Sequence, residues 1–261
     1  MTCFINNPLP DLGTQYQGEL FLFHNLVCLV NEKIHDIFEV FVCQRHEKNN
    51  VIQPVDKDLF NRDHPLKGNW KKEIFRNENS ITIELGCGRG EYTLGLALRH
   101  PERNFIGIDI KGARLWRGAK TAYENKIPNA AFLRTRIEFI NSFFSQDEID
   151  SIWLTFPDPH PGKRNSNKRL TCPWFLNNYR HFLKDCGMIH LKTDNTELYN
   201  YTKSLAERNS LEVVSTTTDL HSEFIGDEIL SILTHYEEIF INEGLKINYL
   251  SFRLPKNKTI E

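Results

Sequence analysis

The stretch Ile81-Thr-Ile-Glu-Leu-Gly-Cys-Gly-Arg-Gly90 decides the fold, because it joins a short apolar run to a loop with three glycines. Residues 81–85 predict a buried strand, and the apolar spacing over residues 91–99 predicts a helix directly after the loop. Glycine adopts positive φ angles and lets the backbone approach a ligand closely. A glycine loop between a strand and a helix therefore indicates a cofactor site of an α/β protein, with a tight strand-to-helix turn as the alternative.

The alternation of strands and helices continues along the chain. A second helix is expected over residues 113–125, and later strands are expected at residues 105–108, 131–133, 151–156 and 188–191. Strands at residues 211–215 and 247–253 bracket a helix-like segment, 227–242. Strands that alternate with helices form βαβ units. We predict an α/β, Rossmann-like, doubly wound and mostly parallel seven-stranded sheet with an antiparallel last strand.

The chain before the glycine loop reads differently. Apolar residues recur at loosely helical spacing between residues 19 and 42, and a polar, proline-containing stretch leads on to residue 70. We expect a partly helical N-terminal extension over residues 1–71, a main domain over residues 72–255 and a short tail over residues 256–261.

Composition bounds the function. The chain has 261 residues, of which 40% are hydrophobic and 25% charged, values typical of folded globular proteins. Its 32 Lys and Arg against 34 Asp and Glu give a net charge of −2, so any nucleic acid must be bound by local patches. Its six cysteines lack metal-ligand spacing, and no apolar stretch is long enough to span a bilayer. We expect a cytoplasmic protein with free thiols, no metal and no membrane contact.

The residues around the glycine loop indicate the kind of cofactor. The loop reads G-x-G-x-G, whereas dinucleotide sites read G-x-G-x-x-G, and the carboxylates of Glu84 and Glu91 flank it. Carboxylates there would repel a pyrophosphate but attract a cationic sulfonium and its ammonium group. Asp109 follows the second strand, where an acidic residue can accept hydrogen bonds from both ribose hydroxyls. S-adenosylmethionine is favoured over NAD, although Asp109 alone could be a solvated strand-end carboxylate.

A second motif, Phe156-Pro-Asp-Pro-His-Pro161, leaves the fourth strand at the carboxyl edge, where open parallel sheets bind ligands. Its prolines restrict the backbone on either side of Asp158. No acidic residue occurs from residue 159 to 184, and the basic residues just after the motif are Lys163, Arg164, Lys168 and Arg169. Such a run can neutralise phosphates without reading sequence, or it can be a solvated loop. Beside a methyl-donor site it points to a nucleic-acid substrate.

From about Leu66 to Phe252 the chain resembles the bacterial tRNA (guanine-N7-)-methyltransferases. The resemblance rests on these motifs: Lys67-Gly-Asn-Trp70, Glu84-Leu-Gly-Cys-Gly-Arg-Gly-Glu91, Gly107-Ile-Asp-Ile-Lys-Gly-Ala-Arg114, Phe156-Pro-Asp-Pro159 with Asn167-Lys-Arg169, Lys192-Thr-Asp194 and Thr234-His-Tyr-Glu237. It implies a class I methyltransferase that methylates N7 of a variable-loop guanosine, guanosine 46, in tRNA.

The resemblance also implies site residues. The cofactor would be bound by Glu84, Gly86, Gly88, Gly90, Asp109, Arg136 and Asp158, with Asp158 as the catalytic residue between donor and guanine. Many family members carry an acidic or amide residue where this chain has Arg136. The tRNA nucleotide would be held by Lys163, Asp194, Thr234, Tyr236 and Glu237. Phosphate contacts are expected from Arg164, Lys168 and Arg169, and the basic motif departs from the family's by about one position around Lys163.

Guanine N7 carries no proton, so methyl transfer to it needs no general base, and positioning and electrostatics should dominate catalysis. The residues Lys111, Arg114, Arg117 and Lys120 repeat every three positions and form either a second phosphate-contacting strip or a solvated helix face. Two other functions share these features: a small-molecule methyltransferase, which has no use for the basic run, and a non-catalytic RNA-binding module. The protein could act as a monomer or a homodimer.

Overall fold

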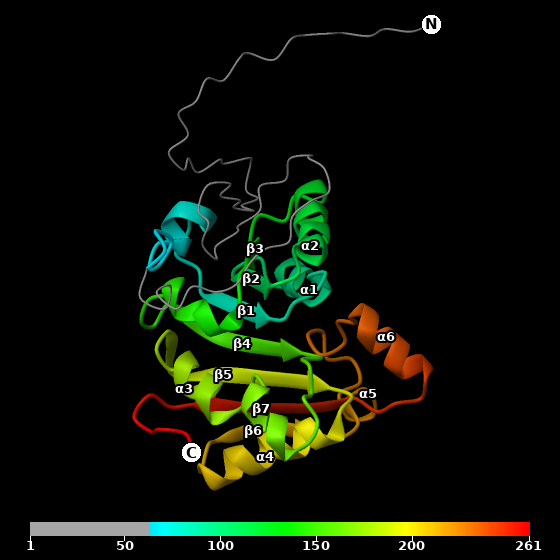
Figure 1. Cartoon of the computed structure of the whole chain (residues 1–261). Coiled ribbons are helices and arrows are strands. Elements are labelled where there is room, and N and C mark those ends of the chain that lie inside the picture. Colours follow the sequence, from blue (N-terminus) through cyan, green and yellow to red (C-terminus); the bar gives the residue numbers. More distant parts are fainter. Residues whose placement is uncertain (1–62) are drawn as a thin grey trace, which may run out of the picture.

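The computed structural model describes residues 63–261, and Figure 1 shows them as one sheet with helices packed on its two faces. The helix expected between residues 19 and 42 lies outside the described residues. Among residues 63–261, no helix is long and apolar enough to cross a membrane.

Seven strands form one sheet in the order β3-β2-β1-β4-β5-β7-β6. They are β1 (Ile81–Leu85), β2 (Asn104–Asp109), β3 (Ala130–Arg134), β4 (Ile149–Thr155), β5 (Leu183–Thr193), β6 (Val213–Thr217) and β7 (Asn248–Leu254). The pairs among β1 to β5 are parallel, whereas β7 runs antiparallel to both β5 and β6. The predicted doubly wound sheet with an antiparallel last strand is confirmed.

Helices cover both faces because the buried strands alternate their side chains between two apolar clusters. Phe105 belongs to the cluster under α1 (Glu91–Arg99) and α2 (Gly112–Glu124), whereas Ile106 belongs to the cluster on the other face. The remaining helical segments are η2 (Trp70–Phe75), η3 (Ile137–Ser142), η4 (Lys163–Lys168), α3 (Pro173–Tyr179), α4 (Thr196–Arg208), α5 (Leu220–Glu223) and α6 (His235–Asn242).

The helix expected over residues 227–242 is only half present, since α6 begins at His235. Two side chains hold the preceding residues in turns. The Asp227 carboxylate accepts hydrogen bonds from the backbone N–H groups of Ile229 and Leu230, and the Thr234 hydroxyl caps α6 by accepting from the Glu237 N–H. Such side-chain acceptors compete with helical bonding and fix where a helix starts.

The core extends beyond both ends of the expected 72–255 domain. Leu66 and Trp70 are buried in the main cluster, and the indole Nε1 of Trp70 donates a 2.9 Å hydrogen bond to the Phe143 carbonyl. At the other end, Ile260 is 2% exposed, and its N–H donates to Asn177. The packed unit therefore begins before residue 72 and includes the tail.

This assignment predicts that Trp70→Ala destabilises the fold by about 3–5 kcal/mol, because it leaves a large cavity in the core and removes the hydrogen bond from the indole to Phe143. The matched control is Trp116→Ala, since the Trp116 side chain on α2 is 41% exposed and should cost less than about 1 kcal/mol. Urea denaturation measures the free energy of unfolding of both variants. Equal losses of stability in the two variants would mean that residues 64–71 belong to the N-terminal extension and not to the packed domain.

Candidate active site

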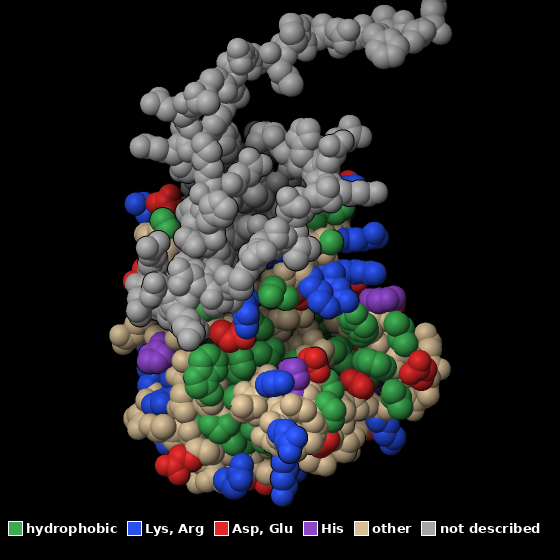
Figure 2. All heavy atoms as spheres, viewed as in Figure 1, with side chains coloured by type: hydrophobic (Ala, Val, Ile, Leu, Met, Phe, Trp, Pro, Cys, Tyr) green, Lys and Arg blue, Asp and Glu red, His purple; other side chains and the backbone are tan. Residues whose placement is uncertain are grey.

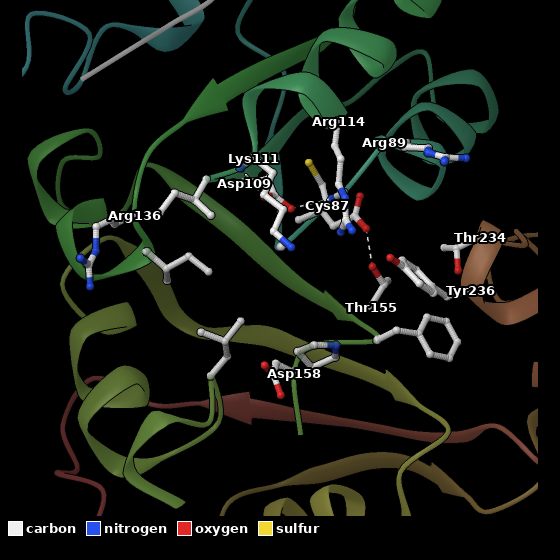
Figure 3. Close-up of a pocket in the computed structure, with 18 of the residues that line it drawn as sticks. Cys87, Arg89, Asp109, Lys111, Arg114, Arg136, Thr155, Asp158, Thr234 and Tyr236 are labelled. Atoms are coloured by element: carbon white, nitrogen blue, oxygen red, sulfur yellow. Dashed lines mark hydrogen bonds between the residues drawn. The ribbon is translucent and has the colours of Figure 1, made fainter. Parts of the chain in front are cut away.

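A cavity of about 590 Å³ opens at the carboxyl ends of the central strands, a size in the range of small-molecule sites. Figure 2 shows the hollow near the centre of the view, with Lys and Arg side chains gathered beside it. Its walls come from the glycine loop, the ends of β2, β3 and β4, and the start of α6. Figure 3 shows side chains from these elements pointing toward one space.

The three loop glycines have different roles, although all have positive φ. Gly86 and Gly88 line the cavity, and a Cβ on either would meet nothing within 4 Å, so they leave open space for a ligand. A Cβ on Gly90 would stand 2.3 Å from the Phe132 ring. Gly90, predicted to bind cofactor, does not line the cavity and instead allows α1 to pack closely on β3.

Glu84 is the most buried acid of the cavity, at 2% exposure. Its carboxylate accepts hydrogen bonds from the Thr93 N–H and hydroxyl and from the Thr155 hydroxyl, the last marked in Figure 3. Burial raises the pKa of Glu84 from 4.5 to about 7, against the lowering effect of these bonds. A cation bound in the cavity would favour the ionised carboxylate.

Asp109, at the end of β2, shapes the neighbouring part of the wall. One carboxylate oxygen accepts a 2.9 Å bond from the Gly88 N–H, and the other accepts a 2.7 Å bond from the Lys111 N–H. A carboxylate has about four acceptor positions, so both oxygens can accept further hydrogen bonds from ligand hydroxyls.

Acidic and basic side chains lie at different depths in the cavity. The carboxylates of Glu84, Glu91 and Asp109 are buried or half-buried, whereas the Arg89, Lys111 and Lys168 side chains are exposed at the rim. An acidic floor suits a cationic ligand, and the glycine loop provides room for its backbone contacts. These residues fit S-adenosylmethionine, and among residues 63–261 no cluster of His, Cys, Asp or Glu could hold a metal ion.

Arg136 lies at the far end of the cavity, where its guanidinium forms a 2.8 Å ion pair with Glu138. Glu138 also lines the cavity and was missed by the sequence analysis. It stands two residues past the position where many family members carry an acidic or amide residue. The resemblance gave no reason to look beyond that position.

Asp158 leaves β4 at the mouth of the cavity, and its side chain is 73% exposed. One oxygen accepts a 3.2 Å hydrogen bond from the His160 N–H, and the His160 ring nitrogen Nδ1 lies 3.8 Å away. The rest of the carboxylate is free to accept hydrogen bonds from a substrate. His160 and Thr155 also line the cavity and were not among the predicted residues, although both directly flank the Phe-Pro-Asp-Pro motif.

The expected phosphate contact by Arg169 is wrong. Its side chain is 3% exposed, stacks over the Tyr201 ring and forms a 2.5 Å ion pair with Glu197. Its guanidinium also donates hydrogen bonds to the carbonyls of Pro159 and His160. Arg169 therefore holds the loop that carries Asp158, while the neighbouring side chains of Lys163, Arg164 and Lys168 are exposed.

Of the predicted nucleotide-binding residues, Lys163 is exposed and does not line the cavity, and the other four separate into three groups. Thr234 and Tyr236 line the cavity, and the Tyr236 ring is 43% exposed, with the Arg114 guanidinium 5.9 Å from its centre. Glu237 is fully buried, so the prediction that it contacts substrate is wrong. Asp194 lines a separate cavity of about 250 Å³, where burial raises its pKa.

Comparison with known proteins places this site in a family. A family model described as "Putative methyltransferase" matches residues 78–250. A tRNA (guanine-N(7)-)-methyltransferase of Bacteroides fragilis is 49% identical over 191 residues, covering 73% of this chain and 75% of the relative. A protein of the same name from Porphyromonas gingivalis is 51% identical over 191 residues, which cover 73% of this chain and 78% of the relative.

The chain belongs to the tRNA (guanine-N(7)-)-methyltransferase family. In structure it is similar to the 16S rRNA methyltransferase KamB, with a TM-score of 0.57 at 13% identity over 75% of this chain and 97% of the other. At that identity the likeness concerns the fold alone. The family membership agrees with the cavity, whose acidic floor and glycine loop fit a methyl donor.

The pKa of Glu84 predicts how donor affinity depends on pH. Because its folded pKa is raised to about 7, Glu84 is protonated below that pH and ionised above it. Affinity for a cationic donor should fall by up to about tenfold per unit as pH drops below 7, and should level off above it. Calorimetry from pH 5.5 to 8.5 measures this, and Glu84→Gln should bind more weakly with a flatter profile. Parallel profiles for wild type and variant would contradict the assignment.

Arg169 and Lys168 make a matched pair for testing the basic segment. Lys168→Ala should lower the slope of log affinity for tRNA against log salt by about 0.7–0.9, as expected for one lost phosphate contact. Arg169→Ala should leave that slope unchanged and instead slow turnover, because it loosens the Asp158 loop. Filter binding at several salt concentrations distinguishes the two variants. A lower salt dependence of tRNA affinity in Arg169→Ala would show that Arg169 contacts a phosphate after all.

Proposed function

We propose that the protein transfers a methyl group from S-adenosylmethionine to N7 of a guanine in tRNA, and that the target is the variable-loop guanosine 46. The observation that carries the proposal is the placement of Asp158, at the mouth of a cavity whose floor holds Glu84 and Asp109. Relatives that carry the name tRNA (guanine-N(7)-)-methyltransferase are 49–51% identical to this chain over most of its length.

The donor would lie along the glycine loop. Asp109 would accept hydrogen bonds from the ribose hydroxyls, and Gly86 and Gly88 leave the space that the ligand needs. Glu84 and Glu91 would attract the ammonium and sulfonium charges. Glu138 and Arg136 stand at the other end of the cavity, where the adenine would lie.

When bound, S-adenosylmethionine supplies an electrophilic methyl group on a cationic sulfur. N7 of guanine offers a lone pair and carries no proton, so the protein need not remove one. The new N–C bond uses that lone pair, and the electrons of the broken C–S bond stay on sulfur. Positive charge therefore moves from the donor to the base.

Asp158 would stabilise the positive charge that develops on the base. Its exposed carboxylate can accept hydrogen bonds from the guanine N1–H and exocyclic amino group, which fixes the base and becomes more favourable as the ring turns cationic. Tyr236 offers a half-exposed ring on which a base can stack. Exposed Lys168 at the cavity, with exposed Lys163 and Arg164 on the same short helical segment η4, can contact phosphates, and so can Lys111 and Arg114, which also line the cavity.

The proposal is tested by incubating the protein with labelled methyl donor and tRNA that lacks modifications, then digesting the tRNA and identifying the labelled nucleoside. We expect 7-methylguanosine from the variable loop. The control is the same tRNA with adenosine at that position, which should accept no label. Label on another nucleoside, or on small molecules alone, would contradict the proposal.

Asp158→Asn should slow single-turnover methyl transfer by about 100-fold or more, because the amide loses one acceptor and the negative charge opposite the cationic product. Folding should be unchanged, since Asp158 is exposed, and most donor affinity should remain, since Glu84, Asp109 and the glycine loop supply the rest of the donor site. Asp185→Asn, an exposed aspartate outside the cavity, is the control. A variant that folds, binds donor and reacts within about threefold of wild type would remove Asp158 from the catalytic role.

A further inference from the structure

Lys192, on the carboxyl half of β5, is a fully buried lysine at 0% exposure. Its ammonium donates to the carbonyls of Leu230 and Ile232 at 3.0 and 3.2 Å, and to the Glu237 carboxylate at 2.9 Å. An ammonium has three donors, and all three have partners here. Lys192 does not line the cavity, so it cannot touch a ligand there.

All three partners lie on one segment, residues 227–237, which leads into α6. This segment carries Thr234 and Tyr236 to the cavity wall. It is irregular before α6, so backbone hydrogen bonding within a helix or sheet does not fix its position. Helix α1 adds two more contacts, because the Tyr92 hydroxyl donates to the Ile229 carbonyl and Glu91 accepts from the His235 N–H.

The buried charge has a specific consequence. Burying an ion pair costs desolvation that an apolar pair of similar size would avoid, so Lys192 and Glu237 are weak evidence for added stability. What they add is specific placement, since three hydrogen bonds from one buried ammonium tie the segment to β5. The Tyr92 ring faces the ammonium at 4.9 Å, and the Glu237 carboxylate can also accept a hydrogen bond from the His221 ring nitrogen Nε2, which lies 3.0 Å away.

We propose that Lys192 is a positioning residue for methyl transfer: through Glu237 and the carbonyls of Leu230 and Ile232, it fixes Thr234 and Tyr236 at the substrate side of the cavity. The inference rests on the proposed function, because it takes the nucleotide to bind against these two residues. It separates substrate positioning from donor binding, which depends on the glycine loop and Asp109.

The test uses three full-length variants. Lys192→Met removes the charge at similar length, and Lys192→Met/Glu237→Leu removes both charges. Lys184→Met is the matched control, because Lys184 lies on the same strand and forms an exposed 2.6 Å ion pair with Asp150 away from the cavity. Steady-state kinetics with tRNA, donor titration, thermal melts and amide hydrogen exchange are measured for each.

We expect Lys192→Met to raise the KM for tRNA at least tenfold, with kcat within about threefold and donor affinity within twofold of wild type. Amides of residues 229–240 should exchange faster, while those of β1 and α1 should not. The double variant should melt at or above the single variant, since no unpaired charge stays buried. Its KM should nevertheless stay high, and Lys184→Met should match wild type.

A purely structural role predicts a different result, in which the double variant regains wild-type KM together with its stability. That outcome, or a KM for Lys192→Met within twofold of wild type, would overturn the inference. If Lys192→Met fails to fold, the double variant supplies the same comparison. Absence of tRNA methylation by the wild-type protein would refute the proposed function instead, and the exchange data would still report whether Lys192 holds the segment.

Discussion

The arrangement of the site depends on one buried carboxylate, that of Glu84 at the end of β1. It accepts hydrogen bonds from Thr93 in the first turn of α1 and from Thr155 at the end of β4. It thereby joins the helix after the glycine loop to the strand that leads into Asp158. The burial that makes these bonds specific also raises the pKa of Glu84 to about 7, a cost that a cationic donor offsets.

Two other parts of the cavity wall, the loop after β4 and the segment before α6, are held in place by buried cations that do not themselves line the cavity. Arg169 binds the carbonyls of the loop that carries Asp158, and Lys192 binds the segment that carries Thr234 and Tyr236. In each case a carboxylate, Glu197 or Glu237, balances the charge. The exposed side chains of Lys163, Arg164 and Lys168 have no such buried role, and in the proposed function they are the ones that contact phosphates.

Periodicity predicted the sheet and the glycine loop well, because apolar spacing and glycine placement report local conformation directly. Residues 81–85 and 91–99 form the expected strand and helix. The sequence predicted the roles of side chains less well where contacts between residues far apart in the chain determine them. A charged residue type does not reveal whether the side chain is buried, so Arg169 and Glu237 were predicted to contact ligands. The polar sequence around Trp70 likewise gave no sign that its indole packs in the core. The turns before α6 arise from Asp227 and Thr234 acting as side-chain acceptors, which overrode the helical spacing.

The central claim is that a carboxylate buried beneath the methyl-donor position controls this site. It is tested most directly by a carbon-13 NMR titration of the Glu84 side-chain carboxyl, assigned with the Glu84→Gln variant, in the free protein and with S-adenosylmethionine bound. We predict a pKa of about 7 in the free protein and a clearly lower value in the complex. A Glu84 carboxyl that titrates near 4.5 and does not respond to the donor would contradict this account.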